Sequence, residues 1–137
     1  MAEGIVAYVD GASSGNPGPS GAGVVFHDEQ GSQLATLSIS LGQATNNVAE
    51  YLALLYCLQE AQRRGFRQLT VKTDSELLAR QFNGQYQVRD GTLRVLHQFA
   101  RHVAAAFDRL SVEHIGREFN AEADRLARRA ARGSPVL

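Results

Sequence analysis

The sequence has little that would place the protein in a membrane or an oxidising compartment. It contains one cysteine, Cys57, which excludes an internal disulfide and a cysteine-based zinc site. No stretch approaches the roughly 18 apolar residues of a membrane span, and the N-terminus lacks the basic and then apolar pattern of a signal peptide. We therefore expect a cytoplasmic protein that makes no membrane contact.

Positive charge is missing from the first part of the chain. Residues 1–62 contain no Lys or Arg, whereas all 14 basic residues lie from Arg63 onward, and 13 of them are Arg. The first part holds six of the 14 acidic residues, so its formal charge is −6 and that of the remainder is 14 − 8 = +6. Such a split indicates a polyanion contact beside an acidic site. Solvated helix faces in an arginine-biased composition are the alternative interpretation.

The length and composition are typical of one globular domain. A chain of 137 residues, 44% hydrophobic and 20% charged, can bury a substantial core. We expect a single domain over residues 1–132 and a short tail over residues 133–137. The first three strands are linked by short turns and should be antiparallel, whereas strands separated by helices should be parallel. The expected strands are 4–12, 21–27, 33–41, 69–73 and 110–115, and the expected helices are 46–64, 75–82, 92–107 and 120–132.

Two carboxylates follow directly on apolar strands. Asp10 ends the run Ile5 to Val9 and precedes a loop rich in Gly, Ser, Asn and Pro. The sheet would hold its backbone while its side chain reaches the surface. Asp74 also ends a strand, and carboxyl ends of neighbouring parallel strands form sites in α/β proteins. An ordinary helix N-cap is the alternative for Asp74.

Two further carboxylates lie near the starts of helices. Glu50 shares a helical face with Leu54 and Cys57, which should point it toward the sheet. The alternative is a capping box formed with Asn47, because Asn46 or Asn47 is a suitable N-cap. Asp124 lies four residues after Asn120, the expected cap of the last helix. Its alternative role is a favourable interaction with the helix dipole.

Four acids at four element ends together indicate a divalent metal site. Hard cations such as Mg²⁺ take oxygen ligands, and two ions about 4 Å apart can promote phosphodiester cleavage. Without metal, clustered carboxylates repel and raise one another's pKa values. The sequence offers no Ser–His–Asp arrangement and no HExxH motif, and none of the four histidines has an obvious partner.

Four ordered motifs resemble the ribonuclease HI family, the type 1 ribonucleases H, over nearly the whole chain. They are DGASSGNPGPSGAG, TNNVAEYLALL, TDSELLARQFNG and REFNAEADRLARRA. The resemblance implies an α/β fold with a five-stranded mixed sheet, three antiparallel strands followed by parallel ones, and helices on both faces. It also implies that two Mg²⁺ or Mn²⁺ ions are held, with substrate bound, by the catalytic residues Asp10, Glu50, Asp74 and Asp124.

The resemblance further implies hydrolysis of the RNA strand of RNA/DNA hybrids, leaving 5′-phosphate and 3′-hydroxyl ends. Contacts to 2′-hydroxyls and the backbone would distinguish RNA from DNA with little sequence specificity. Neither an obligate protein partner nor an oligomer is expected. The expected substrate-binding residues are Gly11, Ser13, Asn16, Thr45, Asn46, Asn47 and Arg117.

The chain departs from many bacterial members in two places. The region of their basic, Trp-containing protrusion is only Gly84 to Gly91 here, and the chain has no Trp. The loop that carries a catalytic histidine is shortened, and His114 falls within a predicted strand. A compact member is therefore expected. Two alternatives are a catalytically weak nucleic-acid-binding module, which the intact acids disfavour, and a DNA-junction nuclease, which the segments around Gly11 and Thr45 disfavour.

Overall fold

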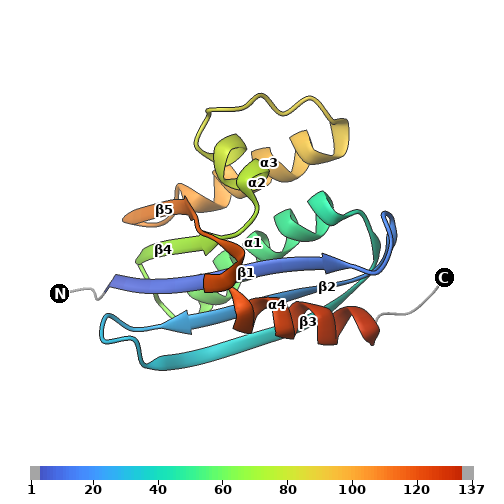
Figure 1. Ribbon diagram of the computed structural model, residues 1–137. Coiled ribbons are helices and arrows are strands. Elements are labelled where there is room, and N and C mark those ends of the chain that lie inside the picture. Colours follow the sequence, from blue (N-terminus) through green and yellow to red (C-terminus); the bar gives the residue numbers. More distant parts are fainter. Residues whose placement is uncertain (1–3, 134–137) are drawn as a thin grey trace.

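The computed structural model describes residues 4–133, which form one mixed sheet with helices on both faces (Figure 1). The strands are β1 (Gly4–Ser13), β2 (Gly18–His27), β3 (Gln33–Ala44), β4 (Gln68–Thr73) and β5 (Arg109–His114). The helices are α1 (Asn46–Arg63), α2 (Glu76–Phe82), α3 (Gly91–Ala104) and α4 (Ala121–Arg132), with a 3₁₀ helix at Arg117–Phe119. Within these residues no helix has the length and apolar character needed to cross a membrane.

The sheet has the strand order β3-β2-β1-β4-β5. β1 pairs antiparallel with β2, and β2 with β3, whereas β1 pairs parallel with β4, and β4 with β5. The predicted fold class is thereby confirmed. In the register of β1 and β4, Val9 lies opposite Thr73. The next residues, Asp10 and Asp74, therefore emerge at the same edge.

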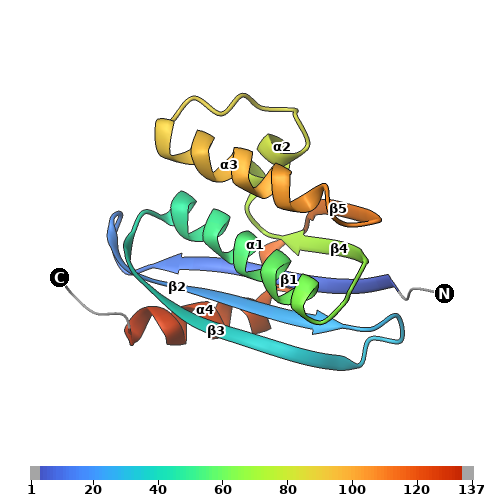
Figure 2. The same cartoon turned by 180° about the vertical axis from the view of Figure 1, so that it is seen from behind.

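The two faces of the sheet are covered differently (Figure 2). α1 packs on one face with α3 beside it toward β5, while α4 crosses the other face over β1, β2 and β3. Glycines let α4 approach closely: a Cβ at Gly23 would lie 2.1 Å from the carbonyl oxygen of Ala123, and one at Gly21 would lie 2.3 Å from that of Ala127. The backbone of α4 is therefore fixed directly on β2.

Several element boundaries differ from the sequence-based expectations. β2 begins at Gly18 rather than at Gly21, because residues 18–20 pair with the end of β3. α3 ends at Ala104 rather than near Phe107, where the chain continues in turns. The 3₁₀ helix at Arg117–Phe119 was not expected. Gly133 is described, and the rest of the predicted tail lies outside the described residues. The single domain over residues 1–132 stays a prediction.

Candidate active site

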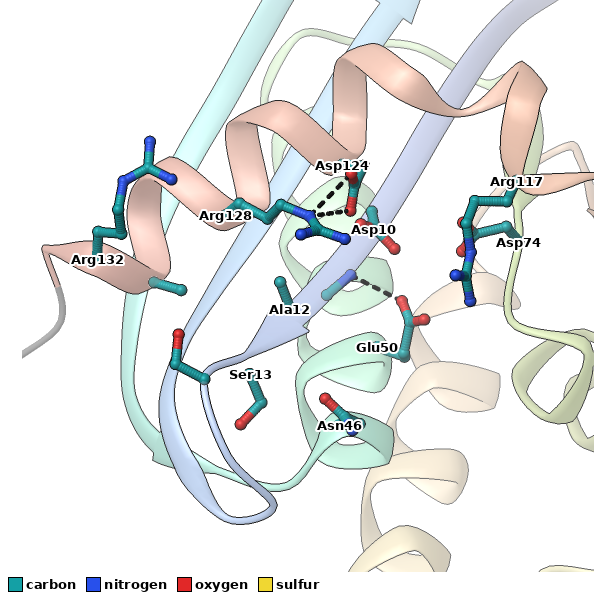
Figure 3. Close-up of a pocket in the computed structure, with 13 residues that line it drawn as sticks. Asp10, Ala12, Ser13, Asn46, Glu50, Asp74, Arg117, Asp124, Arg128 and Arg132 are labelled. Atoms are coloured by element: carbon teal, nitrogen blue, oxygen red, sulfur yellow. Dashed lines mark hydrogen bonds and ion pairs between the residues drawn. The ribbon is translucent and has the colours of Figure 1, made fainter.

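A cleft of about 560 Å³ opens at the edge of the sheet where β1 and β4 end (Figure 3). Its walls come from β1 and the loop after it, the first turns of α1, the segment after β4, and one side of α4. It contains all four predicted acids and three arginines. The lining residues are Asp10, Gly11, Ala12, Ser13, Ser14, Asn46, Glu50, Asp74, Arg117, Asp124, Arg128, Ala131 and Arg132.

Three of the acids form a compact cluster. Asp10, Glu50 and Asp74 each offer a carboxylate oxygen, and these oxygens all lie within 4.8 Å of one another. Asp10 is only 5% exposed and lies within β1, whose residues before it alternate between half-buried and buried. The sequence predicted this meeting of Asp10 and Asp74, because both come directly after the parallel pairing of β1 with β4.

Glu50 reaches the cluster because α1 approaches β1 closely. Its Oε1 accepts a hydrogen bond from the backbone N–H of Gly11 at 2.7 Å. A Cβ at Gly11 would lie 2.3 Å from the carbonyl oxygen of Ala49, so only glycine permits this approach. The helix is capped by Thr45, whose Oγ1 accepts from the N–H of Val48 at 3.2 Å. The predicted asparagine cap, and with it the capping-box alternative for Glu50, is wrong.

Asp74 is likewise free of a capping role. Ser75 caps α2, and its Oγ accepts from the N–H of Leu78 at 3.1 Å. Thr73 supports this turn by accepting from the N–H of Ser75 at 3.0 Å. The N-cap alternative for Asp74 is therefore wrong, and its side chain lies in the cleft beside Arg117 (Figure 3).

Asp124 is brought to the cleft by a long-range contact of Asn120. Asn120 occupies the predicted N-cap position of α4 but makes no capping hydrogen bond. It is buried, and its Nδ2 donates to the carbonyl oxygen of Val9 at 2.9 Å. This bond ties the start of α4 to the end of β1. The two oxygens of Asp124 accept from Nε of Arg128 at 3.1 and 3.0 Å.

The pKa values of two acids are strongly raised. Burial, followed by the charge of Glu50, raises the pKa of Asp10 to about 10, and a hydrogen bond with Asp124 adds to the effect. Burial also raises the pKa of Glu50 to about 8, although the Gly11 N–H and the charge of Arg117 oppose this. Divalent cations would stabilise the ionised carboxylates, and the cluster supplies the hard oxygen ligands that such cations prefer. The residues therefore fit a divalent metal site.

These shifts predict how stability depends on pH in the absence of metal. An acid whose pKa is higher in the folded than in the unfolded protein binds more protons when folded, so stability falls as pH rises above about 4. The loss continues until pH passes the folded pKa values of about 8 and 10. We expect the free energy of unfolding to fall steadily as pH rises through this window.

Thermal unfolding in chelator at pH 5, 6.5 and 8 measures this effect. The melting temperature should fall with rising pH, and Mg²⁺ added at pH 8 should restore it. A melting temperature that rises from pH 5 to pH 8 in chelator would contradict the raised pKa values.

The predicted substrate-binding residues divide into two groups. Gly11, Ser13, Asn46 and Arg117 line the cleft, whereas Asn16, Thr45 and Asn47 do not. Asn16 still lies beside it, because its Oδ1 accepts from the N–H of Asn46 at 2.9 Å.

Two cleft arginines were not among the seven expected substrate-binding residues. Arg128 and Arg132 line the cleft from α4. Their spacing of four and eight residues after Asp124 places them on the same side of this helix, and that spacing could have predicted them.

The fold and the site define a class of protein: an α/β domain with a carboxylate cluster at the carboxyl edge of its sheet that can bind metal. Comparison with known proteins narrows this class. The family model described as "Reverse transcriptase-like" matches residues 8–130. Ribonuclease HI of Halobacterium salinarum is 40% identical over 126 residues, 92% of this chain and 63% of that protein. The bifunctional protein Rv2228c of Mycobacterium tuberculosis is 40% identical over 90% of this chain and 34% of its own length.

Solved structures agree with the sequence comparisons. The crystal structure of RNase H1 from Halobacterium salinarum superposes with a TM-score of 0.93 at 38% identity, covering 96% of this chain and 99% of that one. LC11-RNase H1, solved in complex with an RNA/DNA hybrid, superposes with a TM-score of 0.89 at 40% identity. The match covers 94% of this chain and 97% of that one. The chain belongs to the type 1 ribonuclease H family. It spans less than two thirds of the length of the two curated relatives named above.

Proposed function

We propose that the protein hydrolyses the RNA strand of RNA/DNA hybrids with two divalent metal ions, leaving 5′-phosphate and 3′-hydroxyl ends. The observation that carries this proposal is the cluster of Asp10, Glu50 and Asp74, whose carboxylate oxygens lie within 4.8 Å of one another in the cleft. Family membership supports the choice of reaction, and the hybrid-bound structure of LC11-RNase H1 supports the choice of substrate.

Asp10 and Asp74 would hold one Mg²⁺ or Mn²⁺ ion, and Asp10, Glu50 and Asp124 would hold the other. When bound, such ions activate water and stabilise the leaving 3′ oxygen. The protein's own contribution is positional. The Gly11 N–H holds the carboxylate of Glu50 at 2.7 Å, and Asn120 holds the end of β1 against α4.

The loops beside the acids would bind the backbone of the hybrid. Gly11, Ser13, Asn46 and Arg117 all line the cleft. Figure 3 shows Arg117 on a different wall from Ser13 and Asn46, so a sugar–phosphate backbone entering the cleft would meet both walls. Asn16, Thr45 and Asn47 would contact the flanking nucleotides. Because these are backbone N–H, hydroxyl, amide and guanidinium groups, they suit sugars and phosphates better than particular bases.

An assay with three labelled duplexes tests the proposal. The protein is incubated with RNA/DNA hybrid, duplex RNA or duplex DNA, each with Mg²⁺, with Mn²⁺ or with chelator. We expect cutting of the RNA strand in the hybrid only, and only with metal. The variant Asp108→Asn is a suitable control, because Asp108 is exposed and pairs with Arg67 outside the cleft. No metal-dependent cutting of the hybrid would refute the proposal.

The monomeric state, the cytoplasmic location and the lack of an obligate protein partner stay predictions. Size-exclusion chromatography with light scattering tests the first of these directly. A mass near 14.9 kDa is expected for the monomer.

A further inference from the structure

Arg128 pairs with Asp124, the fourth acid of the cleft. It lies one helical turn after Asp124 on α4, and its Nε contacts both oxygens of that carboxylate at 3.1 and 3.0 Å. Its side chain is 64% exposed and lines the cleft. Figure 3 shows the guanidinium group projecting from α4 toward Asp124 and Asp10. Among the described residues its Nη groups make no hydrogen bond, so they can donate to a further partner.

The four acids are therefore not equivalent in the metal-free protein. Asp10, Glu50 and Asp74 have carboxylate oxygens within 4.8 Å of one another, whereas Asp124 joins them through a hydrogen bond with Asp10 and shares its two oxygens with Arg128. The helix that carries Asp124 is tightly packed, because the backbone of α4 lies directly against Gly21 and Gly23. Exchange of partners at Asp124 thus requires side-chain rotation and no movement of the helix.

We propose that Arg128 is a positioning residue that couples nucleic-acid binding to the second metal site. This inference rests on the proposed function. With no nucleic acid in the cleft, the guanidinium group neutralises Asp124 and competes with a metal ion for its oxygens. A backbone phosphate entering the cleft offers Arg128 a bidentate partner. Asp124 is then released and becomes available as a metal ligand.

The strength of the pair suits such an exchange. Exposed ion pairs between residues four apart on a helix are weak, so a phosphate can displace the carboxylate. Because coupling between two binding events is reciprocal, bound nucleic acid should tighten the second metal site, and metal at that site should tighten nucleic-acid binding. Removing Arg128 should abolish both effects.

Calorimetric titration with Mn²⁺, in the absence of nucleic acid, tests the competition. Arg128→Ala should bind its weaker Mn²⁺ ion about tenfold more tightly than the wild type, because a competing positive charge beside Asp124 is removed. Arg128→Lys keeps the charge and should stay within about twofold of the wild type. The matched control is Arg63→Ala, which removes an exposed arginine that pairs with Glu60 on α1, outside the cleft. Equal or weaker Mn²⁺ binding by Arg128→Ala would overturn the proposal.

Cleavage kinetics test the coupling. In the wild type, the Mn²⁺ concentration for half-maximal rate should fall as hybrid concentration rises, and in Arg128→Ala it should not change. At saturating Mn²⁺, Arg128→Ala should raise KM for the hybrid about tenfold and change kcat by less than about threefold. A large fall in kcat with unchanged KM would contradict the inference. If the wild type does not cut the hybrid, the proposed function fails, while the Mn²⁺ titration still decides whether Arg128 competes for Asp124.

Discussion

Asp10→Asn is expected to lower metal-dependent cleavage of the hybrid by at least about a thousandfold while leaving the protein folded. Asparagine keeps the shape of the side chain but removes the charge that would bind both metal ions. The same substitution should raise stability in metal-free buffer at pH 8. Burial and the charge of Glu50 disfavour ionised Asp10, and a neutral amide avoids that cost.

Two measurements on one variant separate these effects. Initial cleavage rates with Mg²⁺ or Mn²⁺ report the loss of activity, and thermal unfolding in chelator reports the gain in melting temperature. Asp108→Asn, which also removes one carboxylate but from an exposed pair with Arg67, should change neither by much. Retained cleavage by Asp10→Asn would show that Asp10 is not a metal ligand.

Gly11→Ala should have the second largest effect, through packing rather than charge. The added methyl group would lie 2.3 Å from the carbonyl oxygen of Ala49 and 2.4 Å from the backbone nitrogen of Glu50. These are backbone atoms, so α1 must move away from β1. We expect a loss of about 3 kcal/mol in the free energy of unfolding, at the upper end for overpacking. Displacing Glu50 by about 1 Å should also lower activity about a hundredfold.

Gly91→Ala provides the matched control. A Cβ at Gly91 would meet nothing within 4 Å, and this residue is the first of α3. Alanine there should leave stability unchanged or raise it by about 0.5 kcal/mol, because it restricts the unfolded chain. Denaturant unfolding and cleavage assays on the two variants give the comparison. Equal stability of Gly11→Ala and the wild type would show that α1 tolerates the shift.

The sequence predicted those parts of the site that depend on residues close together along the chain. Asp10 and Asp74 each follow an apolar run in the sequence, and the pairing of Val9 with Thr73 carries both to one edge. Glu50 was predicted to face the sheet from helical spacing alone. The true helix cap was missed because Thr45 stands next to two asparagines that are equally suitable caps.

The parts that the sequence did not predict depend on contacts between distant residues. Asn120 has the local pattern of a helix cap, yet its amide bonds to the carbonyl of Val9, 111 residues away. The start of β2 at Gly18 looked like loop because its residues are small and polar, and only pairing with the end of β3 makes them strand. Local propensity carries no information about such partners.

The bond between Asn120 and Val9 has a consequence for the order in which the protein is made. β1 carries the first acid of the cleft, and α4 carries the last, 124 − 10 = 114 residues later along the chain. On the ribosome, β1, β2 and β3 emerge long before α4, the helix that covers the face of these strands opposite α1. A nascent chain can therefore pair these strands and pack α1 first, but the four acids of the cleft come together only after α4 has docked.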